Sequence, residues 1–134
     1  MRVVLDTDVL VTGLLSATGA PGWISEAVLE GALELALDEA IRQEYDEVLH
    51  RAEFQFPPAR IDDLLATIDR VAFVVAASDP WPFSLPDHDD EPFLAVARAS
   101  ASVLVTGNLR HFFARIRAGV TALSPRELIE RMRT

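Results

Sequence analysis

The chain has 134 residues and half of them are hydrophobic, which suits one compact domain and excludes a disordered chain. It contains no cysteine, which excludes disulfides, thiolate metal sites and cysteine nucleophiles; its 12 basic residues are all arginine, so no lysine can act as a nucleophile or phosphate anchor. The formal net charge is −9, which argues against tight non-specific binding of nucleic acid and favours bound cations, a basic protein partner, or both.

The first half of the chain alternates between strand-like and helix-like apolar periods. Its turns and helix ends are marked by Gly19, Pro21, Gly31 and by Asp38, which is a good helix N-cap. The expected elements are a strand at Arg2–Leu5, helices at Asp8–Leu15 and Pro21–Glu30, a strand at Leu33–Leu37 for which a helix is also possible, a helix after Asp38, a helix from Pro57 and Pro58, and a strand at Phe73–Ala76.

The second half continues the alternation after a proline- and aspartate-rich loop at Ala77–Asp89. The expected elements are a helix from Asp90 or Glu91 to Ser100, a strand at Val103–Val105, a short helix at Arg110–Arg115, a strand at Val120–Leu123 and a final helix behind the capping box that begins at Ser124. Strands and helices that alternate in this way predict one α/β domain over residues 1–134, with a mainly parallel sheet between two layers of helices. No run approaches the ~20 apolar residues that span a bilayer, and acidic residues precede the apolar stretch Val9–Leu15, so we expect a cytoplasmic protein without a membrane segment.

Polar oxygen-bearing side chains follow the predicted strands. Asp6 follows the first strand, Asp87 and Asp90 lie before a helix, and Asn108 follows the next strand. Because ligands of open parallel sheets bind outside the carboxyl ends of the strands, these side chains should project toward one edge. Clustered carboxylates repel one another unless they are neutralised, and their hard oxygen atoms suit Mg²⁺ or Mn²⁺.

Each of these residues also has a purely structural interpretation. An aspartate at the end of a strand is often only a helix N-cap. For Asp6, this interpretation has about the same weight as a role in a functional site. A lone glutamate on an amphipathic helix, such as Glu44, usually faces solvent, and the run Asp87–Glu91 could be a solvated loop that favours a helix N-terminus. His50, His88 and His111 lack the spacing of a zinc site.

The order of the motifs resembles that of PIN domains over nearly the whole chain. VVLDTDVLVTGLL is similar to the first motif of the family, LALDEAIRQEYDEVLHR to the helix that carries a metal-binding glutamate, and DHDDEPFLAVARASASVLVTGN to the third block. The tail VTALSPRELIER resembles the endings of a VapC-like subgroup, the toxin components of toxin–antitoxin systems. The resemblance implies a three-layer α/β/α fold.

It also implies a function and a site. The expected activity is Mg²⁺- or Mn²⁺-dependent cleavage of phosphodiester bonds in single-stranded RNA by a toxin endoribonuclease, with a homodimer and a cognate antitoxin as partners. Asp6, Glu44 and Asp90 would hold the cation and carry catalysis, with Asp87 as an additional or outer acid. The other implied residues are Thr7, Thr106 and Asn108 in support of the site, and Arg110 and His111 as contacts to RNA.

Two positions depart from the usual pattern. Many PIN domains have an aspartate where this chain has Asn108, so a second metal ion would be held more weakly, if at all. Asp8 stands where the family more often has asparagine, and its carboxylate either raises the pKa values of its neighbours or faces solvent.

Two other functions compete with this one. The string VVLDTDVLV also resembles the first motif of haloacid-dehalogenase-type phosphatases, with Asp6 as nucleophile and Asp8 as general acid, but those enzymes need a lysine that this chain lacks. A catalytically weak PIN fold could instead serve only as a binding module for RNA or an antitoxin-like protein. Cation-dependent stabilisation would separate the module from the enzyme.

Overall fold

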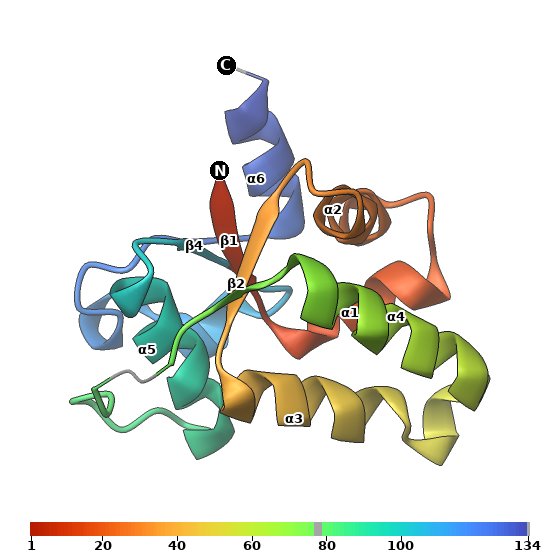
Figure 1. Ribbon diagram of the computed structural model, residues 1–134. Coiled ribbons are helices and arrows are strands. Elements are labelled where there is room, and N and C mark those ends of the chain that lie inside the picture. Colours follow the sequence, from red (N-terminus) through yellow and green to blue (C-terminus); the bar gives the residue numbers. More distant parts are fainter. Residues whose placement is uncertain (77–78, 134) are drawn as a thin grey trace.

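The computed structural model describes residues 1–76 and 79–133 and shows a parallel sheet between helices (Figure 1). Its strands are β1 (Arg2–Leu5), β2 (Glu34–Leu37), β3 (Phe73–Val74), β4 (Val103–Val105) and β5 (Ala122–Leu123). They pair in the order β3-β2-β1-β4-β5, and every pairing is parallel. The predicted sheet is thereby confirmed, and the strand at Leu33–Leu37 is a strand rather than a helix.

The helices cover both faces of the sheet. They are α1 (Thr7–Leu15), α2 (Ala20–Leu29), α3 (Glu39–Leu49), α4 (Pro58–Val71), α5 (Glu91–Ala99) and α6 (Pro125–Met132). In Figure 1, α5 lies on one side of the sheet, α1, α2 and α4 lie on the other, and α3 runs beneath the end at which β2 finishes. This is the three-layer α/β/α arrangement that the sequence predicts.

Local sequence signals explain where the elements begin and end. Asp38 caps α3 by accepting a hydrogen bond from the N–H of Ile41 at 2.9 Å. Ser124 and Glu127 form the predicted capping box of α6. Gly31 ends the turn after α2 with a φ of +83°, a conformation that favours glycine.

The core lies where the apolar periods predict it. The side chains of Val3, Val4 and Leu5 on β1 are fully buried, as expected for a central strand that is covered on both faces. On α3, Ile41 and Tyr45 belong to the buried stripe that faces inward. The core therefore holds β1, and with it the residue that follows β1, in a fixed position.

Some predicted boundaries are wrong for a physical reason. The edge strands β3 and β5 comprise only Phe73–Val74 and Ala122–Leu123, because each edge strand has a partner on one side alone. The helix expected at Arg110–Arg115 is two separate 3₁₀ turns, at Leu109–Phe112 and Ala114–Ile116. The expected loop Ala77–Asp89 ends in a 3₁₀ turn at His88–Asp90, and its residues 77 and 78 lie outside the described residues.

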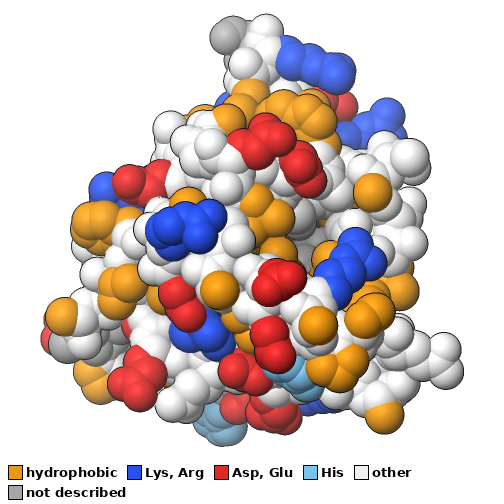
Figure 2. Space-filling model, turned by 45° about the vertical axis from the view of Figure 1, so that its right-hand side comes forward, with side chains coloured by type: hydrophobic (Ala, Val, Ile, Leu, Met, Phe, Trp, Pro, Cys, Tyr) orange, Lys and Arg blue, Asp and Glu red, His pale blue; other side chains and the backbone are white. Residues whose placement is uncertain are grey.

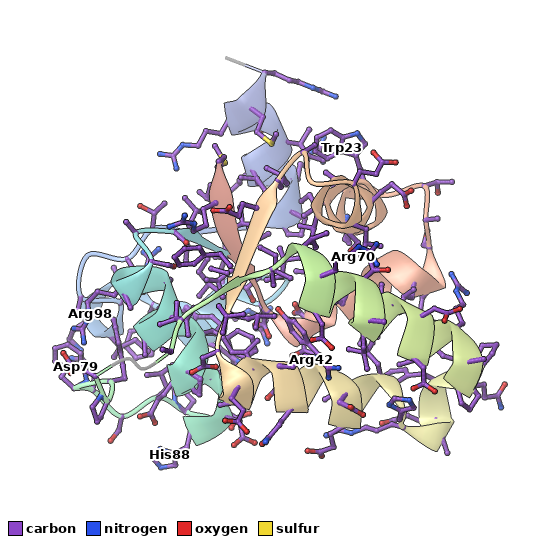
Figure 3. All side chains as sticks on the ribbon, viewed as in Figure 1. Trp23, Arg42, Arg70, Asp79, His88 and Arg98 are labelled. Carbon is purple, nitrogen blue, oxygen red and sulfur yellow. The ribbon has the colours of Figure 1, made fainter. Side chains whose placement is uncertain are left out.

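Trp23 and His88 are two side chains that lie at the surface of the fold. Trp23 on α2 lies close to α6 (Figure 3), and its side chain is 49% exposed. His88 projects away from the body of the protein below α5 in the same figure. Among the described residues, no helix is both long enough and apolar enough to cross a membrane.

Candidate functional site

The carboxyl ends of the central strands bring the first site residues together. β1 ends immediately before Asp6 and β4 immediately before Thr106, and these two strands are neighbours. The N–H of Asp6 donates to the carbonyl oxygen of Val105 at 2.9 Å, which continues the strand pairing as far as the site. As expected, two residues about a hundred positions apart in sequence meet at one edge of the sheet.

Asp6 is held by a short chain of hydrogen bonds. The hydroxyl of Thr106 donates to Oδ2 of Asp6 at 2.8 Å and accepts from the N–H of Asn108 at 3.0 Å. Asp6 occupies the N-cap position of α1, but its side chain makes no capping hydrogen bond. The interpretation of Asp6 as a simple helix cap is therefore wrong.

Glu44 approaches the same edge from α3. Its carboxylate is half-buried and accepts a hydrogen bond from the hydroxyl of Thr7, the first residue of α1. The next residue, Tyr45, is fully buried and donates its hydroxyl proton to the carbonyl oxygen of Leu5 at 2.6 Å. This contact ties α3 to the end of β1, so Glu44 faces the site rather than solvent, contrary to the interpretation as a solvated surface residue.

Asp90 enters the site from the start of α5. Its side chain is buried, and its Oδ2 atom has no hydrogen-bond partner among the described residues. The Nδ1 atom of His111 lies 3.3 Å from this oxygen, close enough for an ion pair when the ring is protonated, although the contact lacks the geometry of a hydrogen bond. A buried carboxylate oxygen that has only this contact is incompletely satisfied, and it is chemically suited to bind a cation.

The electrostatics of the three acids agree with this interpretation. Burial, followed by the nearby charge of Asp8, raises the pKa of Asp6 to about 7, although the hydrogen bond from Thr106 opposes the rise. Burial also raises the pKa of Asp90, with a further contribution from Asp87, and burial raises the pKa of Glu44. These carboxyl groups do not readily carry negative charge together in this position, and a bound cation would remove the difficulty.

The three acids fit a divalent cation in chemical type. They supply hard oxygen atoms of the kind that Mg²⁺ and Mn²⁺ prefer, and one of these atoms is buried and accepts no hydrogen bond among the described residues. Within residues 1–76 and 79–133, no three acidic or histidine side chains already converge on one point as ligands do around a bound ion. The acids are thus neighbours at one edge of the sheet, and their fit to a cation rests on the type of their donor atoms.

The remaining predicted residues lie around this centre. Asp87 is exposed, and one of its carboxylate oxygens accepts a hydrogen bond from the N–H of Asp89 at 2.9 Å. Nδ2 of Asn108 lies 3.1 Å from Nε2 of His111, so Asn108 contacts the ring and not the acids. Arg110 is exposed on the 3₁₀ turn beside the site.

Two contacts are absent from the sequence-based prediction. His111 approaches Asp90, although the sequence suggested only a contact to RNA, and Asp8 accepts a hydrogen bond from the N–H of Gly107 at 3.2 Å. In the sequence, both residues lie next to predicted site positions. This adjacency is the sequence signal that could have identified them.

An acidic cleft lies beside Glu44, one of the three acids. It has a volume of about 240 Å³ and lies between α3 and α5, where its lining includes Glu44, Glu47, Asp89 and Phe93. On the face drawn in Figure 2, Asp and Glu side chains gather in the lower half, whereas Arg side chains are scattered. Substrate phosphates could approach such a surface only with bound cations or local arginines.

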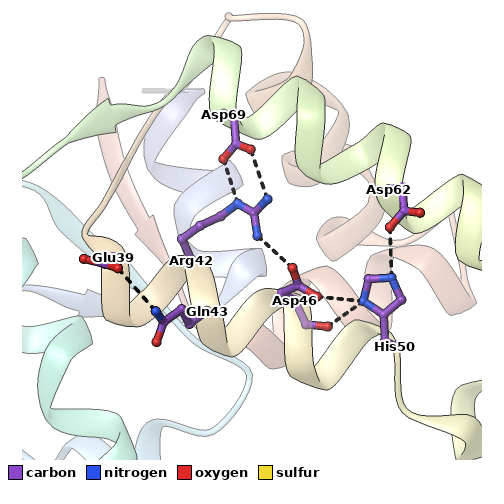
Figure 4. A network of polar contacts seen from close by, with 7 residues as sticks. All are labelled: Glu39, Arg42, Gln43, Asp46, His50, Asp62 and Asp69. Atoms are coloured by element: carbon purple, nitrogen blue, oxygen red, sulfur yellow. Dashed lines mark hydrogen bonds and ion pairs between the residues drawn. The ribbon is translucent and has the colours of Figure 1, made fainter.

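A separate network fixes the outer side of α3 (Figure 4). The guanidinium of Arg42 donates to both carboxylate oxygens of Asp69 on α4, at 2.7 and 3.0 Å, and to Asp46 at 3.3 Å. The ring of His50 lies between Asp46 and Asp62, with its Nε2 atom 3.1 Å from the carboxylate of Asp62. We call these five residues the α3–α4 network; it links the outer side of α3 to α4.

Comparison with known proteins assigns the family. The profile of the PIN domain matches residues 2–110. The fold is similar to that of a chain in the crystal structure of VapBC2 from Rickettsia felis bound to a DNA fragment from their promoter, with a TM-score of 0.63, 15% sequence identity, and coverage of 92% of this chain and 98% of that one. No curated protein matches the chain. Because the profile covers most of the chain and the fold agrees with it, this protein belongs to the PIN-domain family.

Proposed function

We propose that the protein is a metal-dependent endoribonuclease that cleaves single-stranded RNA and acts as the toxin of a toxin–antitoxin pair. Membership of the PIN-domain family supports a nuclease, since PIN domains are in general nucleases that use divalent metal ions. The single observation that carries the proposal is the buried Oδ2 atom of Asp90, which accepts no hydrogen bond among the described residues and whose nearby charged group is His111, beside two further acids whose pKa values are raised.

In this proposal, Asp6, Glu44 and Asp90 hold Mg²⁺ or Mn²⁺, with Asp87 as an outer acid. The cation, when bound, activates water and stabilises negative charge on the phosphate under attack. Thr106 and Thr7 keep Asp6 and Glu44 in place through their hydroxyl groups.

Arg110 and His111, which follow β4, have different proposed roles. Arg110 is exposed beside the site and is free to contact the RNA backbone in the proposed complex. His111 lies between Asp90 and Asn108. We therefore propose that its main role is to support Asp90 and that contact with RNA is secondary. Asn108 supplies no charge to the acids, which favours a single cation.

The phosphatase alternative is disfavoured by the same geometry. A general acid at position 8 would need a carboxyl group that is free to reach the substrate, whereas the carboxylate of Asp8 is bonded to the N–H of Gly107. The chain also lacks the lysine that would steady an aspartyl-phosphate.

The proposed partners rest on the resemblance to VapBC2, because the neighbouring structure contains that pair bound to DNA. We propose a cognate antitoxin that blocks the acidic cleft and a homodimer in the cytoplasm. Light scattering of the purified protein tests the dimer: a mass of twice 14.7 kDa supports it, and a monomer contradicts it.

The decisive experiment is cleavage of labelled single-stranded RNA with Mn²⁺ or Mg²⁺. The parent protein is compared with Asp6→Asn, with Asp90→Asn and with Asp63→Asn, a matched control at an exposed position on α4. We expect metal-dependent cleavage by the parent and the control, and none by the two site variants. If the parent binds Mn²⁺ in calorimetry and cleaves no RNA, the substrate assignment fails; if it binds no Mn²⁺, the binding-module alternative takes its place.

A further inference from the structure

Asp8 makes a specific contact that none of the proposed catalytic roles uses. It lies in the first turn of α1, two residues after Asp6, and its Oδ1 atom accepts a hydrogen bond from the N–H of Gly107 at 3.2 Å. Gly107 follows Thr106 at the end of β4. Asp8 therefore joins the start of α1 to the turn that follows the neighbouring strand.

The carboxylate of Asp8 lies close to the backbone at position 107. A Cβ atom built on Gly107 would lie 2.8 Å from Oδ2 of Asp8, which is closer than real Cβ contacts. Gly107 is not among the residues with a positive φ, so its backbone conformation does not itself require glycine. A side chain at position 107 would therefore displace the carboxylate of Asp8 from the place in which it accepts the N–H of Gly107.

The turn at residues 106–108 is thus fixed from two sides. On one side, the hydroxyl of Thr106 donates its only proton to Oδ2 of Asp6 and accepts from the N–H of Asn108. On the other side, the carboxylate of Asp8 holds the N–H of Gly107. If the turn moved, the Thr106 hydroxyl would move with it and the orientation of the Asp6 carboxylate would no longer be fixed.

We infer that Asp8 is a positioning residue: it fixes the Thr106–Asn108 turn so that Thr106 stays on Oδ2 of Asp6 and Oδ1 of Asp6 is left for a cation. The part of this inference that concerns the cation rests on the proposed function, whereas the fixing of the turn does not. Asp8 itself does not hold the cation.

The hydrogen bond needs an oxygen atom and not a negative charge. The amide oxygen of asparagine would accept the same N–H, so Asp8→Asn should preserve the turn, whereas Asp8→Ala should release it. This contrast separates a positioning role from a ligand role, since a cation ligand would lose much of its strength in the asparagine variant.

The test follows the amide of Gly107 by NMR and the affinity for Mn²⁺ by calorimetry in the full-length protein. In Asp8→Ala we expect the Gly107 amide proton to shift upfield and to exchange about tenfold faster, and Mn²⁺ binding to weaken by about tenfold, as for loss of a supporting hydrogen bond. In Asp8→Asn both quantities should stay close to those of the parent, as they should in the control Asp63→Asn.

Two results would overturn the inference. One is a Gly107 amide that does not respond to Asp8→Ala; the other is equal loss of Mn²⁺ affinity in Asp8→Asn and Asp8→Ala, which would make Asp8 a ligand. If the parent neither binds Mn²⁺ nor cleaves RNA, the proposed function fails, yet the response of Gly107 still decides whether Asp8 fixes the turn.

A double-mutant cycle gives a second test. It measures melting temperatures and does not need an NMR spectrum of every variant. Gly107→Ala should lower the melting temperature in the parent, because the added methyl group meets the carboxylate of Asp8. The same change should have a smaller effect in the Asp8→Ala background, where the space is free. Equal effects in the two backgrounds would contradict the contact.

Discussion

The acids that lie on the two sides of α3 differ in their burial and in whether an arginine contacts them. Toward the sheet edge, Glu44 joins Asp6 and Asp90, which are buried and have no arginine partner in any contact described here. Toward α4, Asp46 and Asp69 are half exposed and share the guanidinium of Arg42 (Figure 4). One helix thus separates buried or half-buried acids that lack an arginine partner in the contacts of the described residues from surface acids that share one.

The pKa values differ in the same sense. Burial raises the pKa of Asp6 to about 7, whereas the hydrogen bonds from Arg42 lower the pKa of Asp69. Paired acids support the fold, and unpaired buried acids oppose it until a cation binds. Acids that oppose the fold are expected where a protein sacrifices stability for function.

The largest expected effect comes from removing a charge at the sheet edge. Asp6→Asn should lower RNA cleavage by roughly a hundredfold to a thousandfold, because the variant loses an anionic ligand of the proposed cation. In the absence of metal it should also be more stable than the parent at pH 8, since it removes a buried charge that has no cationic partner. Cleavage assays and urea unfolding measure the two effects; a variant that loses both activity and stability would contradict the comparison.

The pH dependence of stability is the next effect in size. Because the pKa of Asp6 is raised from 3.8 to about 7 in the folded state, the folded protein binds more protons than the unfolded chain between these values. The free energy of unfolding should therefore fall as pH rises from about 4 to 7, by an amount on the order of a few kcal/mol, and then level off.

This slope should be measured by urea unfolding with EDTA present. Asp6→Asn isolates the contribution of Asp6, because its curve should be flatter than that of the parent over the same range. His50, whose pKa is raised mainly by its hydrogen bond to the backbone of Asp46, contributes a slope of the same sign, but it does so equally in both proteins. At pH 8, Mn²⁺ at about 100 times its dissociation constant should restore about 2.7 kcal/mol to the parent; no gain would contradict the cation site.

The sequence predicts the sheet edge better than it predicts the contacts within it. Asp6, Asp90 and Asn108 are expected from one rule, that the carboxyl ends of parallel strands share an edge, whereas Thr106 and Glu44 are expected from the family motifs. The contact of Asp8 with Gly107 joins residues 99 positions apart, and no local pattern determines which of two neighbouring acids receives which hydrogen bond. The approach of His111 to Asp90 depends on the exact path of the 3₁₀ turns, which sequence periodicity does not determine.

Substitution of Tyr45 should have an effect of intermediate size, because this residue ties α3 to the end of β1. Its hydroxyl is buried and bonded to the last carbonyl of β1, so Tyr45→Phe should lower the free energy of unfolding by about 1–2 kcal/mol. Since Glu44 is the adjacent residue, RNA cleavage should fall as well, but by less than in Asp6→Asn. Urea unfolding and a cleavage assay at saturating Mn²⁺ check both; an unchanged stability would show that the hydrogen bond does not hold α3 in place.

The smallest effect belongs to the α3–α4 network. Arg42 and Asp69 meet in a bidentate pair, but the side chain of Asp69 is 53% exposed, so solvent screens their attraction. A double-mutant cycle with Arg42→Ala and Asp69→Ala should give a coupling of about 0.5 kcal/mol that weakens as salt is added. RNA cleavage should stay close to that of the parent, because neither residue lies at the sheet edge. A coupling of several kcal/mol, or a large loss of cleavage, would mean that the paired acids also position Glu44, and the division of α3 into a structural side and a functional side would then be wrong.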